Sequence, residues 1–450
     1  MKWLTRILIK GGLLVTMNPQ RRVIEDGAVA VDGERIVDLG PTRDVEAKHS
    51  ADLVVEAKGK IVLPGLVCAH THLYAVLLRG APLKIKPPGD FIQALHRVWW
   101  PCDEALTEKD AYASALAAGA DMVTTGTTCF ADTFSGPNYI HGSLSAIARA
   151  IEEIGMRGIL AFEATERNSR EEGARGLDEN QRFIKEVKEK GSKLIRGMYS
   201  LHASFTLSDD IIVEARKLAT RDRAYMTIHT SEGLVDLYHN LERYGKRTVE
   251  RLKDLGVLGR DVVLAHCVHL NEEELNIVAE EGCGVAHNPM SNMLNAVGVA
   301  PVPDMLKRGI TVGIGNDGYI FDGFENMRSA FLVHKLQRRD PRVMTPLEIL
   351  EMATINGAKL YGLDEETGSI EKGKQADIIV VSSDSVPTPL TPETVAGHIV
   401  NSVRGTDVEM VVVAGRVVME HRVMKTVDRQ TANTVAREAA HSLWERIKGI

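Results

Sequence analysis

Eight short apolar segments rich in β-forming residues alternate with helical segments between residues 61 and 365 of this 450-residue chain. Such alternation is typical of a parallel α/β sheet, because each parallel strand needs a long crossover connection to reach the next. Eight units favour a closed (β/α)8 TIM barrel over a doubly wound sheet, and no GxGxxG motif follows any of the segments. The predicted strands are 61–68, 127–132, 157–162, 194–201, 225–228, 262–265, 284–286 and 311–315.

Both ends of the chain have a different pattern. Residues 1–63 consist of strand-like runs separated by turn signals, and similar runs return at 376–381, 408–413 and 417–420. We therefore expect an α/β chain in which 1–63 and 366–428 join in one β-sandwich domain beside a catalytic barrel of residues 64–365. Residues 429–450 have the pattern of a closing amphipathic helix.

The composition limits the classes of partner. A hydrophobic content of 44% with 26% charged residues is typical of a soluble globular protein, and a net charge of -7 argues against nucleic acid or an anionic membrane as the main partner. No run of 18 apolar residues predicts a membrane span, and the charges within residues 1–10 favour a strand over a signal peptide. Five cysteines without CxxC spacing favour reduced thiols and a cytoplasmic location. A homodimer or larger homo-oligomer remains open.

His70 and His72 stand one residue apart at the end of the first predicted barrel strand. Side chains at positions i and i+2 of a strand point to the same face, so the two imidazoles can share one metal ion. An isolated pair fits two unrelated polar residues equally well. The residues that end the other strands therefore decide the interpretation.

The other strand ends carry the same kinds of side chain. Barrel enzymes place their chemistry at the C-terminal ends of the strands, so these residues are expected to meet on one rim. Core packing does not explain so many polar groups there. In chain order, the fourth to eighth strands are followed by His202, by His229 with Glu232, by His266, by His287 and by Asp317.

One divalent metal ion fits this rim. Three imidazoles and one carboxylate suit zinc or iron and leave a position open for water, which the ion would turn into a hydroxide nucleophile near neutral pH. Glu232 is placed to accept the proton of that water and to protonate a ring nitrogen of the substrate, and His266 to stabilise the developing charge. Asp317 is also a candidate proton acceptor. The predicted ligands are His70, His72, His229 and Asp317.

Six segments in this order and spacing resemble the motifs of the amidohydrolase superfamily: PGLVCAHTHLYAVLLRG, SLHASF, TIHTSE, LAHCVHL, AHNPMSNMLNAVGVAPV and GIGNDG. The similarity covers residues 10–425 and is to the aminohydrolase branch, which contains adenosine-derivative, guanine and cytosine deaminases and triazine hydrolases. Three further segments, DFIQALHRVWWPCDEAL among them, are similar to an aminohydrolase encoded beside selenium and purine-metabolism genes. The resemblance implies a metal-dependent barrel with one metal ion at the four predicted ligands, with Glu232 and His266 catalytic and His202 contacting the substrate.

Two positions depart from the pattern of that branch. Asn316 stands where a Thr usually precedes the last metal-binding Asp, which changes the hydrogen bonds available beside the site. Asp103 stands where deaminases of adenosine-type nucleosides carry a Glu that binds ribose hydroxyls. A nucleoside and a compact ring compound therefore both remain open as substrates. We predict that Asp103 and Trp100 contact the substrate, although Phe91, Trp99 and Trp100 lie at a helical spacing that favours loop packing.

These observations predict a hydrolase acting on a small heterocycle. We expect a metal-dependent aminohydrolase that releases ammonia from a purine, pyrimidine, pterin-like or triazine ring. A cyclic-amide hydrolase or a chlorohydrolase with the same site is the alternative, because these reactions share the hydroxide step. A non-catalytic metal-binding protein would be expected to lack Glu232 or a ligand, and all are present. Glu163 and Arg167, after the third strand, fit substrate binding and a solvated loop equally well.

Overall fold

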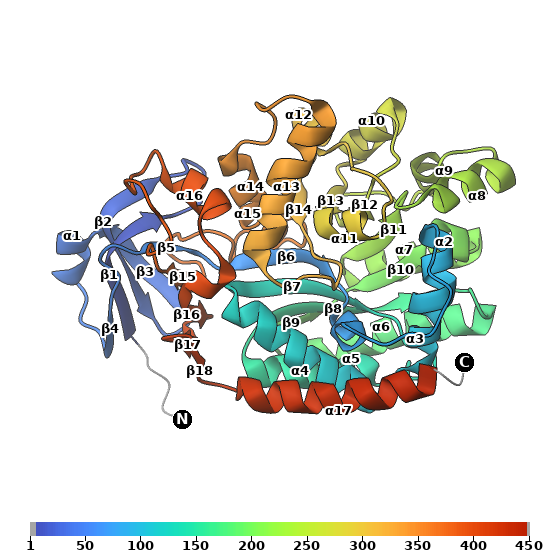
Figure 1. Cartoon of the computed structure of the whole chain (residues 1–450), viewed down its shortest axis with the longest axis horizontal. Coiled ribbons are helices and arrows are strands. Elements are labelled where there is room, and N and C mark those ends of the chain that lie inside the picture. The colour runs from blue at the N-terminus through green and yellow to red at the C-terminus, as the bar shows by residue number, and fades with distance from the viewer. Residues whose placement is uncertain (1–5, 448–450) are drawn as a thin grey trace.

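The computed structural model describes residues 6–447, and these residues form two β-sheets with helices packed around one of them (Figure 1). One sheet is a ring of parallel strands, and the other joins strands from both ends of the chain. The predicted fold class, a (β/α)8 barrel with a flanking β-sandwich domain, is confirmed. Within the described part of the chain, no helix is long and apolar enough to cross a membrane.

The barrel strands follow one another around the ring in chain order. The ring closes beyond β14, where the backbone amides of Asn316 and Asp317 donate to the carbonyl oxygen of His70, at 2.9 and 3.2 Å. The predicted strand 194–201 is divided at Met198 into two strands, of which β10 continues the ring. The strands are β6 (Leu66–Thr71), β7 (Thr127–Phe134), β8 (Arg157–Ala164), β9 (Ile195–Gly197), β10 (Tyr199–Ala203), β11 (Met226–Thr230), β12 (Val262–His266), β13 (Gly284–His287) and β14 (Val312–Ile314).

The prediction of 61–68 as one barrel strand is wrong. Its first half, β5 (Ile61–Pro64), belongs to the other sheet, and only β6 belongs to the barrel. The chain changes sheets at Gly65, where a Cβ atom would lie 2.0 Å from Thr128 Oγ1, so no larger residue fits at this crossing. The predicted domain boundaries at residues 63/64 and 365/366 stay predictions.

Helices cover the outside of the barrel (Figure 1). In α5, Leu144, Ile147, Ile151 and Ile154 recur at helical spacing and are buried in the largest apolar cluster, between strands and helices. The longer helices are α4 (Glu108–Thr124), α5 (Ser143–Ile154), α6 (Arg170–Lys190), α7 (Asp209–Asp222), α8 (Leu234–Tyr244), α10 (Glu272–Glu281) and α13 (Gly323–Arg338). The shorter ones are α2 (Phe91–Ala94), α3 (Trp100–Ala105), α9 (Thr248–Asp254), α11 (Pro289–Leu294), α12 (Val302–Lys307), α14 (Pro346–Met352), α15 (Ile355–Lys359) and α16 (Val395–Asn401).

The second sheet joins the two ends of the chain through the antiparallel pairing of β5 with β15. Along β15, Ile378 and Val380 face a core made within this sheet, whereas Ile379 and Val381 belong to the apolar cluster of the barrel. The alternation of strand side chains thus buries both faces of β15. The strands are β1 (Arg6–Val15), β2 (Val23–Asp32), β3 (Arg35–Pro41), β4 (Leu53–Glu56), β5, β15 (Ile378–Val381), β16 (Val408–Val413), β17 (Arg416–Glu420) and β18 (Val423–Met424), with α1 (Thr42–Glu46) following β3.

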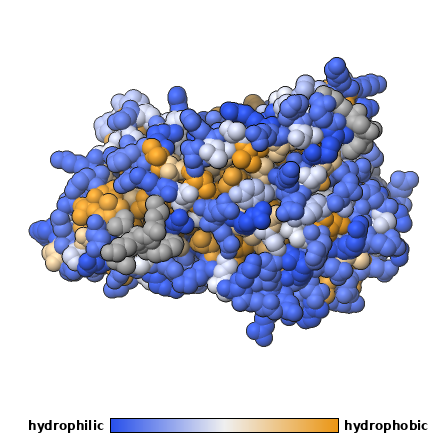
Figure 2. All heavy atoms as spheres, turned by 90° about the horizontal axis from the view of Figure 1, so that it is seen from below, coloured by the Kyte–Doolittle hydropathy of each residue, from blue (hydrophilic) through white to orange (hydrophobic). Residues whose placement is uncertain are grey.

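The C-terminal helix α17 (Arg429–Ile447) starts beside the second sheet and runs along α4 of the barrel (Figure 1). Trp444 Nε1 donates to the carbonyl oxygen of Leu77 at 2.8 Å, which ties this helix to the barrel. Seen from the side on which α17 lies, the surface is largely hydrophilic, with apolar residues gathered in small patches (Figure 2). Residues 1–5 of the predicted first strand and residues 448–450 of the predicted helix lie outside the described residues.

Candidate active site

Four strand-end residues converge at the C-terminal rim of the barrel. His70 and His72 come from β6, His229 from β11, and Asp317 from the turn after β14. His229 Nε2 lies 3.2 Å from His70 Nε2 and 3.3 Å from His72 Nε2, and Asp317 Oδ1 lies 3.0 and 3.2 Å from the same two nitrogens. One possible ligand atom from each of these four residues therefore lies within 4.8 Å of the ligand atoms of the other three.

The hydrogen bonds of the imidazoles turn Nε2 toward the centre of this cluster. His72 Nδ1 lies 2.8 Å from the carbonyl oxygen of Thr133, and His229 Nδ1 lies 2.8 Å from that of His202. A carbonyl only accepts, so each Nδ1 carries a hydrogen and Nε2 is the nitrogen left to bind a metal ion, as in metal-binding histidines. Burial lowers the pKa of His70 to about 4, which keeps it neutral. The donor set fits one divalent metal ion.

Neighbouring polar groups hold Asp317 in place. Ser291 Oγ donates to its Oδ2 at 2.5 Å, which leaves Oδ1 to face the imidazoles. Asn316, the departure noted in the sequence, accepts from Thr71 Oγ1 at 2.7 Å and from the backbone amide of Gly318 at 2.9 Å. Asn316 thus fixes the turn that carries the carboxylate.

Glu232 and His266 lie beside this cluster. His266 Nε2 is 3.7 Å from Glu232 Oε2 and 3.7 Å from Asp317 Oδ1, while its Nδ1 is 2.8 Å from Asn292 Oδ1. Burial raises the pKa of Glu232 to about 7. Burial lowers the pKa of His266, but the charges of Glu232 and Asp317 outweigh this effect and raise it to about 9. A carboxyl group with a pKa near neutrality can both take up and release a proton.

Several of these residues have a left-handed backbone conformation that side chains disfavour. The φ angles are 47° at Ser231, 71° at His266 and 55° at Asp317. Each such residue costs about 1–3 kcal/mol and persists only where the surroundings enforce it. At Ser231, the buried carboxylate of Asp236 accepts from the backbone amide at 2.7 Å, which fixes the turn that carries Glu232.

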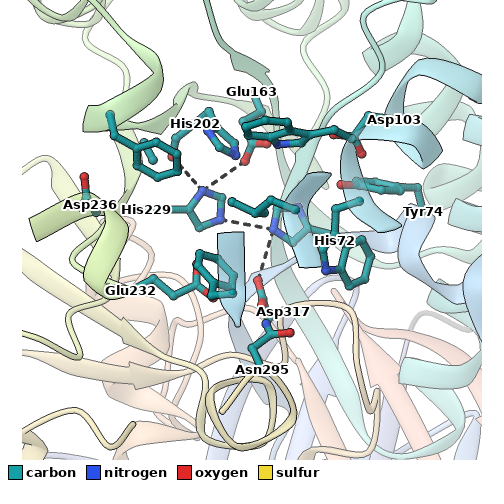
Figure 3. Close-up of a pocket in the computed structure, with 17 residues that line it drawn as sticks. His72, Tyr74, Asp103, Glu163, His202, His229, Glu232, Asp236, Asn295 and Asp317 are labelled. Atoms are coloured by element: carbon teal, nitrogen blue, oxygen red, sulfur yellow. Dashed lines mark hydrogen bonds and ion pairs between the residues drawn. The ribbon is translucent and has the colours of Figure 1, made fainter. Parts of the chain in front are cut away.

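A pocket of about 650 Å³, counting its open mouth, lies over the metal cluster (Figure 3). The aromatic residues of 91–100, whose spacing favours loop packing, form one wall of this pocket. The residues of this wall are Phe91, Leu95, Trp99 and Trp100, from α2, the π-helical turn η2 (Leu95–Trp99) and α3.

His202 lies on the opposite side of the pocket from Asp317 (Figure 3). Its Nδ1 is 2.8 Å from Thr206 Oγ1, and that hydroxyl donates to the carbonyl oxygen of Ala203 at 3.0 Å. Thr206 must therefore accept from His202 Nδ1, which leaves Nε2 for a ligand. Burial lowers the pKa of His202 to about 3, so this imidazole is neutral.

Asp103 is buried in the pocket wall together with a basic partner. Arg167 Nη1 donates to Asp103 Oδ2 at 2.7 Å, and Ser135 Oγ donates to the same oxygen at 3.1 Å. Asp103 Oδ1 is buried and has no hydrogen-bond partner among the described residues. The guanidinium of Arg167 also lies 5.4 Å from the ring centroid of Trp100. Both predicted substrate contacts, Asp103 and Trp100, therefore line the pocket, each beside Arg167.

His287 and Glu163 lie in different surroundings, one outside the pocket and one in its wall. His287 ends β13 but does not line the pocket; its Nε2 lies 3.1 Å from Nε2 of the buried His334, behind the rim. Glu163, for which the sequence left substrate binding and a solvated loop open, lines the pocket. Its Oε1 lies 3.3 Å from His229 Nδ1. Burial raises the pKa of Glu163 to about 8.

The segment after β13 supplies supporting residues that the strand-end argument did not single out. They hold His266 and Asp317, and the side chain of Asn295 also hydrogen-bonds to Glu232. Their spacing of i, i+3, i+4 and i+7 is that of one helical face, so a polar face on a short helix was the available signal. These residues are Asn288, Ser291, Asn292 and Asn295.

Comparison with known proteins agrees with this geometry. Residues 61–418 match the Amidohydrolase family, and residues 27–49 match the imidazolonepropionase-like composite domain of bacteria. The chain is 36% identical over 446 residues to the 5'-deoxyadenosine deaminase of Methanosarcina mazei, covering 98% of this chain and 99% of that protein. It is 32% identical over 449 residues to the 5-methylthioadenosine/S-adenosylhomocysteine deaminase of Desulforamulus reducens, with 98% and 99% covered.

Solved structures share the whole architecture. An adenosine deaminase from Xanthomonas campestris with bound zinc superimposes with a TM-score of 0.89, at 26% identity, with 99% of both chains covered. The atrazine chlorohydrolase of Arthrobacter aurescens, complexed with zinc, gives a TM-score of 0.82 at 23% identity, with 96% of this chain and 100% of that chain covered. The second similarity concerns the fold alone.

Proposed function

The chain belongs to the amidohydrolase family, and on that premise we propose that it is a metal-dependent hydrolytic deaminase acting on the purine amino group of an adenosine derivative. The observation that carries the proposal is the meeting of a complete donor set with Glu232 and His266 at the rim of the barrel, where members of both groups line one pocket. The relatives with 32–36% identity over nearly the whole chain support the adenosine class.

Zinc is the proposed ion, held by the three imidazoles and the carboxylate of the cluster. A divalent ion bound there supplies Lewis acidity and lowers the pKa of a water molecule. Three imidazoles with one carboxylate favour zinc, and the zinc-bound deaminase structure supports the same choice. Iron is the alternative, and metal analysis of the purified protein distinguishes the two.

The side chains of the pocket account for the proton transfers. Glu232 accepts a proton from the water that adds to the carbon bearing the amino group, and passes it to the adjacent ring nitrogen. His266 faces the same centre and stabilises the oxygen that becomes negative. The hydroxyl group added to the carbon then gives up its own proton, which a carboxylate of the site, Glu232 or Asp317, passes to the amino nitrogen. The bond between the carbon and this nitrogen breaks, a carbonyl forms and ammonia leaves.

The remaining walls select a flat ring. We propose that Trp100 and its aromatic neighbours pack on the ring face, and that His202 Nε2 hydrogen-bonds to the ring edge. Asp103 is proposed to contact the substituent on the ring, because this residue lines the pocket beside Arg167. We also propose a cytoplasmic location, supported by five cysteines that are all buried free thiols.

The test is turnover by zinc-loaded protein of 5'-deoxyadenosine, adenosine, guanine, cytosine and an aminotriazine, with ammonia release and the ultraviolet shift of deamination measured. We expect deamination of the adenosine derivatives. In a Glu232→Gln variant, kcat should fall by about 10²–10⁴ while one equivalent of metal is retained. Absence of ammonia release from every compound by the metal-loaded enzyme would refute the proposal, as would unchanged kcat in Glu232→Gln.

A further inference from the structure

Asp236, in the first turn of α8, carries a carboxylate that the proton transfers proposed above do not use. It lies at the edge of the catalytic pocket (Figure 3), and the residue is only 2% exposed. Its Oδ2 accepts from the backbone amide of Ser231 at 2.7 Å, and its Oδ1 accepts from Ser204 Oγ at 2.5 Å. Both oxygens of Asp236 are therefore bonded within the protein.

The hydrogen bond to Ser231 holds the peptide directly before Glu232. Ser231 has a φ of 47°, a left-handed conformation that a residue with a side chain keeps only where its surroundings enforce it. The carbonyl oxygen of Ser231 accepts from the backbone amides of Val268 and His269 at 3.1 and 3.0 Å. The turn is thus held by backbone on one side and by the Asp236 side chain on the other, and a substitution can remove only the second hold.

The hydrogen bond to Ser204 anchors the carboxylate itself at the end of another barrel strand. Ser204 directly follows β10, two residues after His202. Asn240 Nδ2 donates to Ser204 Oγ at 2.6 Å, and Arg251 Nη1 donates to the carbonyl oxygen of Ser204 at 2.8 Å and to Asn240 Oδ1 at 3.1 Å. Ser204, Asn240 and Arg251 are all buried. A buried network whose members bond to one another in this way is rigid, so Asp236 is held in one orientation.

We propose that Asp236 is a positioning residue, which holds the carboxyl group of Glu232 at the reacting atoms through the backbone of Ser231. The inference rests on the deaminase function proposed above and adds a residue to its machinery. Proton transfer by Glu232 depends on hydrogen-bond distances, and a misplacement of about 1 Å reduces a rate by about 10²-fold. The metal ligands keep hydrogen bonds of their own, so release of this turn should leave metal binding intact.

The test compares Asp236→Ala in two backgrounds, with the zinc-loaded protein and the fastest substrate of the panel above. In the unmodified background, kcat should fall by about 100-fold with KM within about threefold and metal content unchanged. In the Glu232→Gln background, measured under single-turnover conditions, the same substitution should change the residual rate by less than about threefold. A residue that acts through Glu232 loses its effect once that carboxyl group is gone.

Two further variants complete the experiment. Ser204→Ala removes the anchor of Asp236 Oδ1 but keeps the carboxylate, so kcat should fall by about five- to tenfold, again only where Glu232 is present. This variant carries the same test if Asp236→Ala does not fold. Asp178→Ala, at an exposed carboxylate of α6 that does not line the pocket, is the control and should leave kcat unchanged.

The outcomes separate the positioning role from other roles of Asp236. Unchanged kcat in both Asp236→Ala and Ser204→Ala would overturn the inference and leave the deaminase intact. An equal loss of rate in the two backgrounds would also overturn it, because Asp236 would then support the fold and not Glu232. Weaker calorimetric binding of substrate to the zinc-loaded double variant than to Glu232→Gln would make Asp236 a substrate contact instead. Absence of ammonia release by the unmodified protein from every compound would overturn the proposed function itself.

Discussion

The two walls of the pocket are built in opposite ways. On the metal side, the side chains come from strand ends, and their remaining polar atoms are bonded: His72 to Thr133, His229 to the carbonyl of His202, and Asp317 to Ser291. On the substrate side, atoms of Trp100, Asp103 and Arg167 are buried without partners. The ligands of the metal side are therefore held in place by hydrogen bonds within the protein, whereas these atoms of the opposite wall have no such bond among the described residues.

The largest effect is expected on the metal side itself. His229→Ala removes one of four donors from a cluster in which every donor lies within 4.8 Å of the others. We expect loss of bound metal, and loss of activity by at least about 10³-fold, since even a supporting partner costs 10- to 100-fold. Elemental analysis and steady-state rates measure this. Full metal occupancy in the variant would show that the four donors are not the binding set.

The next largest effect on metal binding is expected for Ser291, which supports the metal side of the pocket. Ser291→Ala removes the hydrogen bond to Asp317 Oδ2 and frees the carboxylate to rotate. Metal affinity or kcat should decrease by about 10- to 100-fold. The measurement is metal retention during titration with a chelator, with Ser442→Ala, at an exposed serine of α17, as the control. Identical retention in both variants would contradict preorganisation by Ser291.

On the substrate side, Asp103→Asn should act on binding and leave the chemical step intact. The substitution removes the charge that faces Arg167 and weakens the contact to the substrate substituent. We expect KM to increase about tenfold with kcat within about threefold, the pattern of an interaction made equally in the ground and transition states. Equal decreases of kcat and kcat/KM would instead place Asp103 in the transition state.

The smallest effect is expected for Trp100→Phe. This change keeps an aromatic ring on the pocket wall, although a smaller one, and removes the unpartnered Nε1. One lost neutral hydrogen bond to a ligand corresponds to about a two- to tenfold increase in KM. Titration of the ligand followed by tryptophan fluorescence measures it. Unchanged affinity would mean that the ligand leaves Nε1 unbonded.

Much of the metal side could be predicted from the sequence, because its residues directly follow predicted strands in the chain. A polar residue directly after an apolar strand is expected on the rim of a parallel barrel, and this rule places His70, His229 and Asp317 without knowledge of any distant contact. His287, which ends β13, turns away from the pocket. Comparison with the structure corrects one element, the strand 61–68. The residues of an apolar run do not indicate which sheet the strand will join. The change of sheet at Gly65 is evident only from the closeness of this glycine to Thr128 in the structure.

The substrate side was less predictable because it depends on contacts between distant segments. Arg167 pairs with Asp103 across 64 positions of the chain, and nothing near either residue specifies the other. The aromatic residues around Trp100 have the spacing of a packing helix whether they face a core or a cavity. The polar face that begins at Asn288 was visible in the sequence, but its role depends on the neighbouring position of His266.

The pairing of β5 with β15 also has a consequence for how the chain folds during synthesis. The N-terminal strands emerge first, but the partner of β5 is made only after the last barrel helix. Until then the edge of β5 has free backbone groups and exposed apolar side chains, features that promote aggregation. A barrel that folds during synthesis therefore forms while its neighbour is half built, and the C-terminal strands then complete the second sheet.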